Sequence, residues 1–202
     1  TGGPFGGDLN YHRHRYEGRV YLPSVFKRFT TMMRLRLGTV NGYPWIGGVI
    51  PDYARFRLGG GNTADPLRGY DDYQIVPGKF VHVLYDTTFA DFNHTDGVDT
   101  VTSITDNGRR LRYPGGRYMA LFTFEQQFPI AHPLHGVLFF DAGNTWDLRR
   151  ELRPMDFKIG AGLGFRMEIP LLGNIGFDYG YGFHRDDKPR WAGHFMLGNV
   201  NF

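Results

Sequence analysis

Hydrophobic and polar residues alternate with a period of two over long parts of the chain. In Lys158–Ile169 one set of alternate positions is apolar, whereas the other set holds Lys, Gly, Arg and Glu. In Ile175–Phe183 apolar and aromatic residues alternate with Gly and Asp. Because successive side chains of a β-strand point to opposite faces, this pattern predicts strands with one apolar and one polar face. The predicted strands are 9–22, 31–41, 117–128, 137–146, 157–169, 175–183 and 193–202.

A soluble β-sandwich also alternates in this way, and three features favour a membrane β-barrel instead. The polar face carries Gly, Arg, Asp and Glu, which is expected of a wet lumen. The longer and shorter predicted connections alternate, as outer loops and periplasmic turns do in a transmembrane barrel. Aromatic residues lie near strand ends, as in interface girdles. These are Tyr118, Trp146, Tyr181, Phe183 and Phe202. The expected fold class is therefore all-β, an antiparallel transmembrane β-barrel.

Composition narrows the alternatives further. The chain has 202 residues with 29 Gly, 16% aromatic residues and no Cys, which favours strands and tight turns over helices and excludes a disulfide framework. No stretch approaches the ~18 consecutive apolar residues of a membrane helix. The net charge of +3 is compatible with a nucleic-acid partner, and a basic aromatic cluster, Arg13, Arg15, Tyr16 and Arg19, exists. These arginines fall on the presumed lumen face, so we expect no nucleic-acid partner.

The number of predicted strands suggests that the barrel is incomplete. Single-chain bacterial barrels have an even number of strands, at least ~8, and unpaired edges in lipid are costly. The chain starts at Thr1 without a signal peptide. We therefore expect residues 1–202 to be the C-terminal part of one barrel domain, with further strands before Thr1. Alternatively, the long connection hides a hairpin, for example Phe80–Thr87 with Thr100–Thr105.

The long connection, about residues 42–116, carries the most specific motif. A Gly-rich segment, Phe56–Gly61, precedes Leu67, Arg68, Gly69 and Tyr70. This order resembles the sixth outer loop of the BamA superfamily, whose tip has a (V/L)-R-G-(F/Y) motif after Gly-Gly. Four further features follow in the family's order. They are Thr123–Glu125, Phe139–Trp146, the Gly-rich strand Gly160–Pro170 and an aromatic C-terminus. The resemblance implies the second half of a roughly sixteen-stranded barrel.

The motif arginine has two predicted partners. By strand parity, Glu125 and Asp141 both point into the lumen on adjacent strands, and a guanidinium offers a rigid fork that two carboxylates can satisfy together. A loop of this length in a compact domain is either functional or disordered. We expect the loop to fold back inside the barrel and Arg68 to pair with both carboxylates, as the resemblance also implies. The alternative is that Arg68 is an exposed loop arginine.

The end of the chain resembles the C-terminal β-signal by which barrels are recognised for assembly. The residues that carry this resemblance are Gly198, Val200 and Phe202. The simpler alternative is a last strand that ends in a girdle aromatic residue.

The resemblance implies an assembly factor that folds and inserts β-barrel proteins into the bacterial outer membrane. Such a protein is not an enzyme and needs no catalytic residue and no cofactor. The implied partners are the outer-membrane lipid bilayer with its lipopolysaccharide, substrate β-barrel proteins and accessory assembly lipoproteins. Within the same superfamily, a two-partner secretion or TamA-like translocation barrel is the alternative.

Two other classes have weaker support. An outer-membrane enzyme would need a nucleophile, but Ser24 and Ser103 lie outside any G-x-S-x-G elbow, and an acid-based site at His94 and Asp91 has no further support. A metal site at His12 and His14 lacks a third ligand with suitable spacing, so we expect no metal. A soluble β-rich binding module remains an alternative, and solubility without detergent would favour it.

Overall fold

The computed structural model describes most of the chain. The described residues are 10–23, 28–43, 48–77, 81–95, 98–112, 115–169, 173–185 and 191–197. They fall into two compact units, Thr1–Pro77 with Gly115–Phe202 and Gly78–Pro114, and each is considered by itself. Within these residues, no helix is long and apolar enough to cross a membrane.

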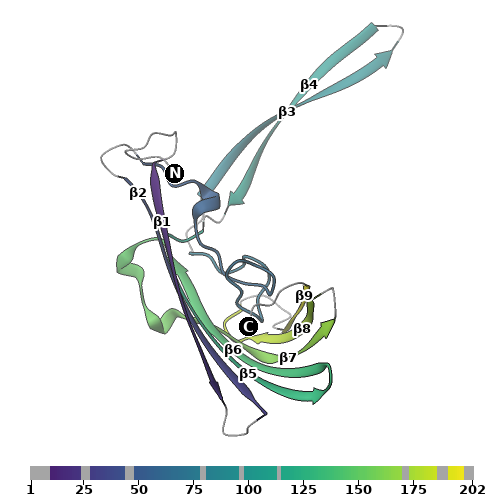
Figure 1. Ribbon diagram of the computed structural model, residues 1–202. Helices are drawn as coiled ribbons and strands as arrows, with labels where there is room; N and C mark the ends of the chain where they lie inside the picture. The colour runs from purple at the N-terminus through teal and green to yellow at the C-terminus, as the bar shows by residue number, and fades with distance from the viewer. Residues whose placement is uncertain are drawn as a thin grey trace. The chain divides into compact units, whose positions relative to one another are not determined.

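The first unit is a seven-stranded antiparallel sheet with the order β1-β2-β5-β6-β7-β8-β9 (Figure 1). Its strands are β1 Tyr11–Pro23, β2 Thr30–Gly42, β5 Tyr118–Ala131, β6 Leu134–Trp146, β7 Lys158–Ile169, β8 Gly173–Gly182 and β9 Trp191–Leu197. The predicted all-β antiparallel fold is confirmed. Each predicted strand has a counterpart, although residues 198–202 of the last one lie outside the described residues. β5 and β6 extend further toward their shared turn than the sequence pattern indicates.

Burial along the strands follows the predicted alternation. In β5, Leu121, Thr123 and Glu125 are buried, whereas Phe122 and Phe124 between them are partly exposed. We call the face that carries the buried set the inner face, and the opposite one the outer face. Tyr16 lies on the outer face and is 64% exposed.

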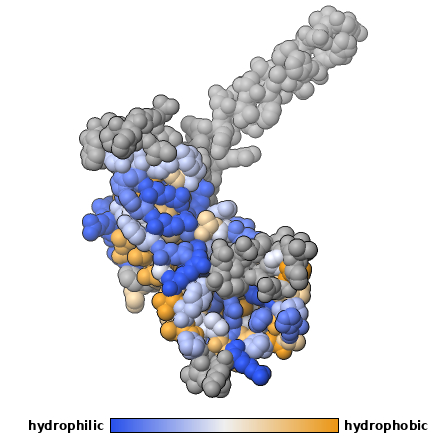
Figure 2. Space-filling model, viewed as in Figure 1, coloured by the Kyte–Doolittle hydropathy of each residue, from blue (hydrophilic) through white to orange (hydrophobic). Residues whose placement is uncertain are grey.

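The outer face is apolar and solvent-accessible over several neighbouring strands. Its exposed side chains include Val20, Leu22, Met33, Leu35, Leu37, Leu138, Phe140, Leu163, Phe165, Tyr179 and Phe195. Figure 2 shows strongly apolar and strongly polar residues side by side on the described surface. A contiguous apolar surface of this kind indicates contact with lipid or with another protein rather than with water.

The connections alternate between the two ends of the strands, as predicted. Three short turns lie at one end of the strands: Pro23–Thr30, Ala131–Leu134 and Ile169–Gly173. The connections after β2, β6 and β8 lie at the other end of the strands and are longer. The strict alternation of longer and shorter connections is that of a transmembrane barrel.

The second unit is an antiparallel hairpin of β3, Val81–Thr95, and β4, Val98–Arg112. A hairpin within the long connection was the alternative expectation from the sequence. The observed hairpin is longer than Phe80–Thr87 with Thr100–Thr105, and Thr87 pairs with Asp106. It forms a separate two-stranded sheet and adds no strand to the larger one.

The core of the first unit lies between the inner face and residues 48–77, which the sheet curves around (Figure 1). The buried apolar residues come from this segment and from β2 and β5. They are Val40, Ala54, Phe56, Leu58, Leu67, Tyr70, Ile75, Met119 and Leu121. A loop therefore takes the place that a second sheet occupies in a β-sandwich.

Candidate functional site

The segment between β2 and the hairpin has a backbone structure of its own. Isolated β-bridges join Leu58 to Ile75 and Gly60 to Leu67 within the segment, and Phe56 to Gly116 just before β5. Gly60 has a φ of 79°, in the left-handed region that favours glycine, so the Gly-rich sequence permits the reversal that leads to the tip. The bridge to Gly60 fixes the start of the tip, Leu67–Tyr70, within the segment.

Arg68 is buried and meets three carboxylates from three different strands. Its Nε and Nη2 donate to the two oxygens of Asp141, at 2.7 and 2.9 Å, and its backbone N–H donates to the same carboxylate at 3.1 Å. Its Nη1 donates to Glu125 at 2.5 Å and to Asp178 at 3.2 Å. Such bidentate, charge-assisted contacts fix the orientation of the guanidinium as well as its position.

Three neighbours of Arg68 were not identified from the sequence. Asp178 also accepts from both terminal nitrogens of Arg166, at 2.6 and 2.9 Å, so it joins the two arginines. The ring of Phe139 covers the Arg68 guanidinium, 3.8 Å from the ring centroid to Cζ. Each of the three has inner-face parity, and this was the available signal. The sequence gives no reason to choose them from the other inward residues.

The surrounding carboxylates keep Arg68 charged. Burial by itself lowers the pKa of its guanidinium, but Asp141 and Glu125 outweigh burial and hold that pKa well above its ordinary value. An arginine is therefore suited to this position, because a lysine could lose its proton when buried and lacks the planar fork.

The tip lies directly on the backbone of β7 and β8, at positions where the strands have no side chain. A Cβ on Gly160 would lie 1.8 Å from the carbonyl oxygen of Arg68. Cβ atoms on Gly180 and Gly182 would lie 2.7 and 2.5 Å from the N and O of Gly69. Gly69 itself has a φ of 90°. The alternate glycines of the two strands therefore form a shallow seat for the tip, and we call it the glycine seat.

Polar groups of the last strands complete the contacts of Gly69 and Tyr70. The Gly69 N–H donates to Nε2 of His194 at 3.2 Å, and its carbonyl accepts from Arg185 at 3.2 Å. The Tyr70 hydroxyl donates to the carbonyl of Ile159 at 3.0 Å. Because the backbone groups of the buried tip are paired, its burial leaves few polar groups without a partner.

A second group of contacts holds the base of the same segment to β1 and β2. Phe56 is fully buried, and the guanidinium of Arg13 lies 4.5 Å from its ring centroid. Asp65 accepts from Arg15 at 2.7 Å and lies 3.7 Å from Arg36. The Arg36 Nη1 also donates to the carbonyl of residue 64 at 2.8 Å. The segment therefore contacts β1 and β2 at one end of the strand order and β7 and β8 near the other end.

Asp65→Asn is expected to have a small effect. Burial raises the pKa of Asp65 more than the neighbouring arginines lower it, so the charged form gains little from this position. Its closest partner, Arg15, is 34% exposed and can turn to solvent, so we expect the variant to lower the stability of the folded protein by under about 1 kcal/mol near neutral pH. Because the folded pKa is raised, the carboxyl contributes most to stability when protonated, and this contribution is lost as the pH rises through the raised pKa. Thermal unfolding of the two proteins between pH 3 and 8 measures both effects; a large loss at neutral pH would contradict them.

The predicted site residues are partly brought together. Leu67, Arg68, Gly69 and Tyr70 lie on the inner face with Glu125 and Asp141, whereas Gly198, Val200 and Phe202 lie outside the described residues. Nε2 of His14 and Nδ1 of His12 are 3.1 Å apart. In the described part of the chain, no three His, Asp or Glu side chains are grouped so as to hold a metal ion.

Comparisons with known proteins identify the family of the chain and a similar fold. Residues 1–200 match the model of the Omp85 superfamily domain, and the chain belongs to that superfamily. Among solved structures it is similar to BamA from Haemophilus ducreyi, in a crystal structure lacking POTRA domains 1–3, with a TM-score of 0.61 and 17% sequence identity. The match covers 94% of this chain and 34% of that one, so the chain spans about a third of the BamA chain. No curated protein sequence matches the chain.

Proposed function

We propose that this chain is part of an assembly factor that folds β-barrel proteins and inserts them into the bacterial outer membrane. The observation that carries the proposal is that the two faces of one sheet differ chemically. The outer face is apolar and exposed, whereas the inner face holds the Leu67–Tyr70 tip through Arg68, Glu125 and Asp141. Membership of the Omp85 superfamily supports the same assignment.

The physical task explains why no catalytic residue is needed. A substrate strand that enters lipid alone leaves its backbone N–H and C=O groups unpaired, and each unpaired group costs several kcal/mol. A strand edge of the assembly factor can pair with these groups while the substrate enters the bilayer. The partners would be unfolded β-barrel proteins, the lipid bilayer with its lipopolysaccharide, and accessory assembly lipoproteins. In this function the tip stiffens the barrel wall from inside.

Reconstitution tests the proposal. The full-length protein in liposomes should speed the folding of a urea-unfolded small β-barrel, measured as the fraction that resists unfolding in cold detergent on electrophoresis. Empty liposomes are the control. Equal folding in both preparations would contradict the proposal. A large steady conductance without faster folding would instead favour a two-partner secretion or TamA-like translocation barrel.

A further inference from the structure

The connection between β6 and β7, residues 147–157, folds back over the outer face of the sheet. Asn144 and Trp146 have outer-face parity at the end of β6. The Asn144 side chain donates to the carbonyl of Asp156 at 2.7 Å, and the rings of Trp146 and Phe157 are 5.9 Å apart. Trp146 is only 6% exposed despite its outward direction, because the connection covers it. Figure 1 shows this segment on the side of the sheet away from the interior loop.

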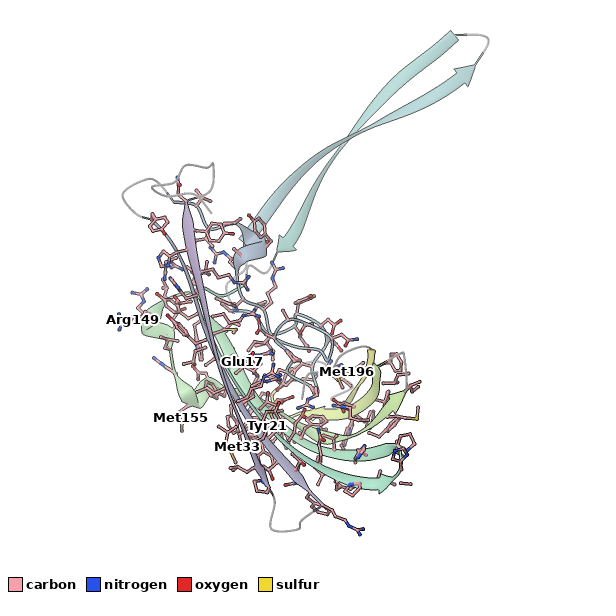
Figure 3. The ribbon with its side chains drawn as sticks, viewed as in Figure 1. Glu17, Tyr21, Met33, Arg149, Met155 and Met196 are labelled. Atoms are coloured by element: carbon pink, nitrogen blue, oxygen red, sulfur yellow. The ribbon has the colours of Figure 1, made fainter. Side chains whose placement is uncertain are left out.

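The surface of this connection combines positive charge with exposed apolar groups. Arg149, Arg150 and Arg153 are exposed, and none of them forms an ion pair with any other residue that the structure describes. Leu152 and Met155 are 42% and 95% exposed. Figure 3 shows Arg149 and Met155 directed away from the sheet.

The carboxylates of the same connection offset this charge only in part. Asp147 pairs with Arg55 at 2.9 Å and with Arg117 at 3.2 Å. The Glu151 side chain accepts from the backbone N–H of residue 148 at 3.1 Å. Asp156 is exposed and Glu151 half-buried, so the outward surface has three positive groups against two negative groups.

The aromatic residues at this end of the strands place the connection near a membrane boundary. Trp191 stacks on Tyr179 with ring centroids 4.9 Å apart and meets Tyr181 edge-on at 5.1 Å. All three have outer-face parity, and Trp191 begins β9 at the end of the strands where the longer connections lie. Tyr and Trp gather where the hydrocarbon of a membrane meets water. Guanidinium groups and apolar side chains on one short segment match a ligand with phosphates above acyl chains.

We propose that residues 147–157 form a docking surface for the phosphate-bearing glycolipid of the outer leaflet, the lipid A part of lipopolysaccharide. This inference rests on the proposed function, because it requires the outer face to lie in the outer membrane. Arg149, Arg150 and Arg153 contact the phosphates, and Leu152 and Met155 insert among the first carbons of the acyl chains. The docked lipid anchors the wall next to β6 and β7.

The test compares lipid binding by the full-length protein embedded in nanodiscs of neutral phospholipid. Bisphosphorylated lipid A and its dephosphorylated form are titrated separately, and bound lipid is counted by native mass spectrometry. Each basic residue near a membrane surface contributes about fivefold in affinity. The triple variant R149Q/R150Q/R153Q should therefore bind bisphosphorylated lipid A roughly 100-fold more weakly, with unchanged binding of the dephosphorylated form.

Two control variants separate the parts of the proposal. Arg28→Gln neutralises an exposed arginine at the opposite end of the strands and should leave lipid A binding unchanged. Met155→Ser should weaken the binding of both lipid forms. The docking surface would be overturned if the triple variant bound lipid A as well as the unmodified protein. It would also be overturned if Arg28→Gln lost as much lipid A affinity as the triple variant, or if inorganic phosphate competed fully with lipid A.

Failure of this proposal is distinguishable from failure of the proposed function. A full-length protein that stays dispersed and monodisperse without any amphiphile would overturn both. A membrane-embedded protein that folds substrate barrels, but whose triple variant binds lipid A normally, overturns only the docking surface.

Discussion

Arg68→Ala is expected to release the loop tip from the inner face and to abolish most of the assembly activity. The change removes the ion-pair partner of Glu125 and Asp141, whereas Asp178 keeps its ion pair with Arg166. Among the described residues, Arg34 is a further cation that interacts with Glu125 and Asp141, but it forms no ion pair with either. Removing one partner of a buried ion pair typically costs about 3–5 kcal/mol. The open form of the loop should therefore become roughly 100- to 5,000-fold more populated. Limited proteolysis within residues 48–77 of the membrane-embedded protein measures this population.

Charge exchange provides the control for the Arg68 prediction. Arg68→Glu should be at least as damaging as Arg68→Ala, and Glu125→Arg or Asp141→Arg in the same protein should restore part of the activity and protease resistance. Arg68→Lys should give an intermediate loss, since it retains the charge but not the bidentate contact with Asp141. If Arg68→Ala leaves cleavage and assembly unchanged, the tip is not held by this ion-pair network.

Gly160→Ala is expected to displace the tip without changing any charge. The added Cβ would lie 1.8 Å from the Arg68 carbonyl oxygen, so the tip or β7 must move by about 1.5 Å to relieve the overlap. Overpacking of this kind costs roughly 3 kcal/mol, and the movement also lengthens the Arg68 contacts with Asp141. We expect faster proteolysis of the loop and weaker assembly activity, in the same direction as Arg68→Ala.

Gly18→Ala is the matched control for the Gly160 prediction. Gly18 lies in a strand of the same sheet, and a Cβ there would meet nothing within 4 Å. An alanine in a strand is usually no worse than a glycine where space permits. The Gly18 variant should therefore retain protease resistance and activity. Equal behaviour of the two variants would show that the glycine seat does not position the tip.

The sequence predicts the sheet because each strand has chemically different faces. Alternation identifies the seven strands, and the same parity places Glu125 and Asp141 on the inner face, where Arg68 meets them. The pairing of Arg68 needed one further step. A long connection with a Gly-rich approach suggested that the motif returns to the sheet.

Other features depend on distances that parity does not give. Asp178 was placed on the inner face from its sequence pattern, but its position between Arg68 and Arg166 follows from the register of β7 with β8. The glycines of these strands indicated only a polar face, whereas three of them seat the tip. The hairpin of β3 and β4 was only an alternative expectation, because its pattern is short and mixed.

The glycine seat has a consequence for the order in which the molecule forms. The inward-facing glycines of β7 and β8 have no side chains that could cover the inner face of these strands. The loop tip, from a distant part of the chain, covers that face instead. The contacts that hold it there join residues 89 and 110 positions apart. Contacts of such long range form late, because a large loop must close before they contribute. The wall next to β9 therefore becomes stiff only after the tip arrives, and a nascent barrel passes through a stage in which this wall is pliable.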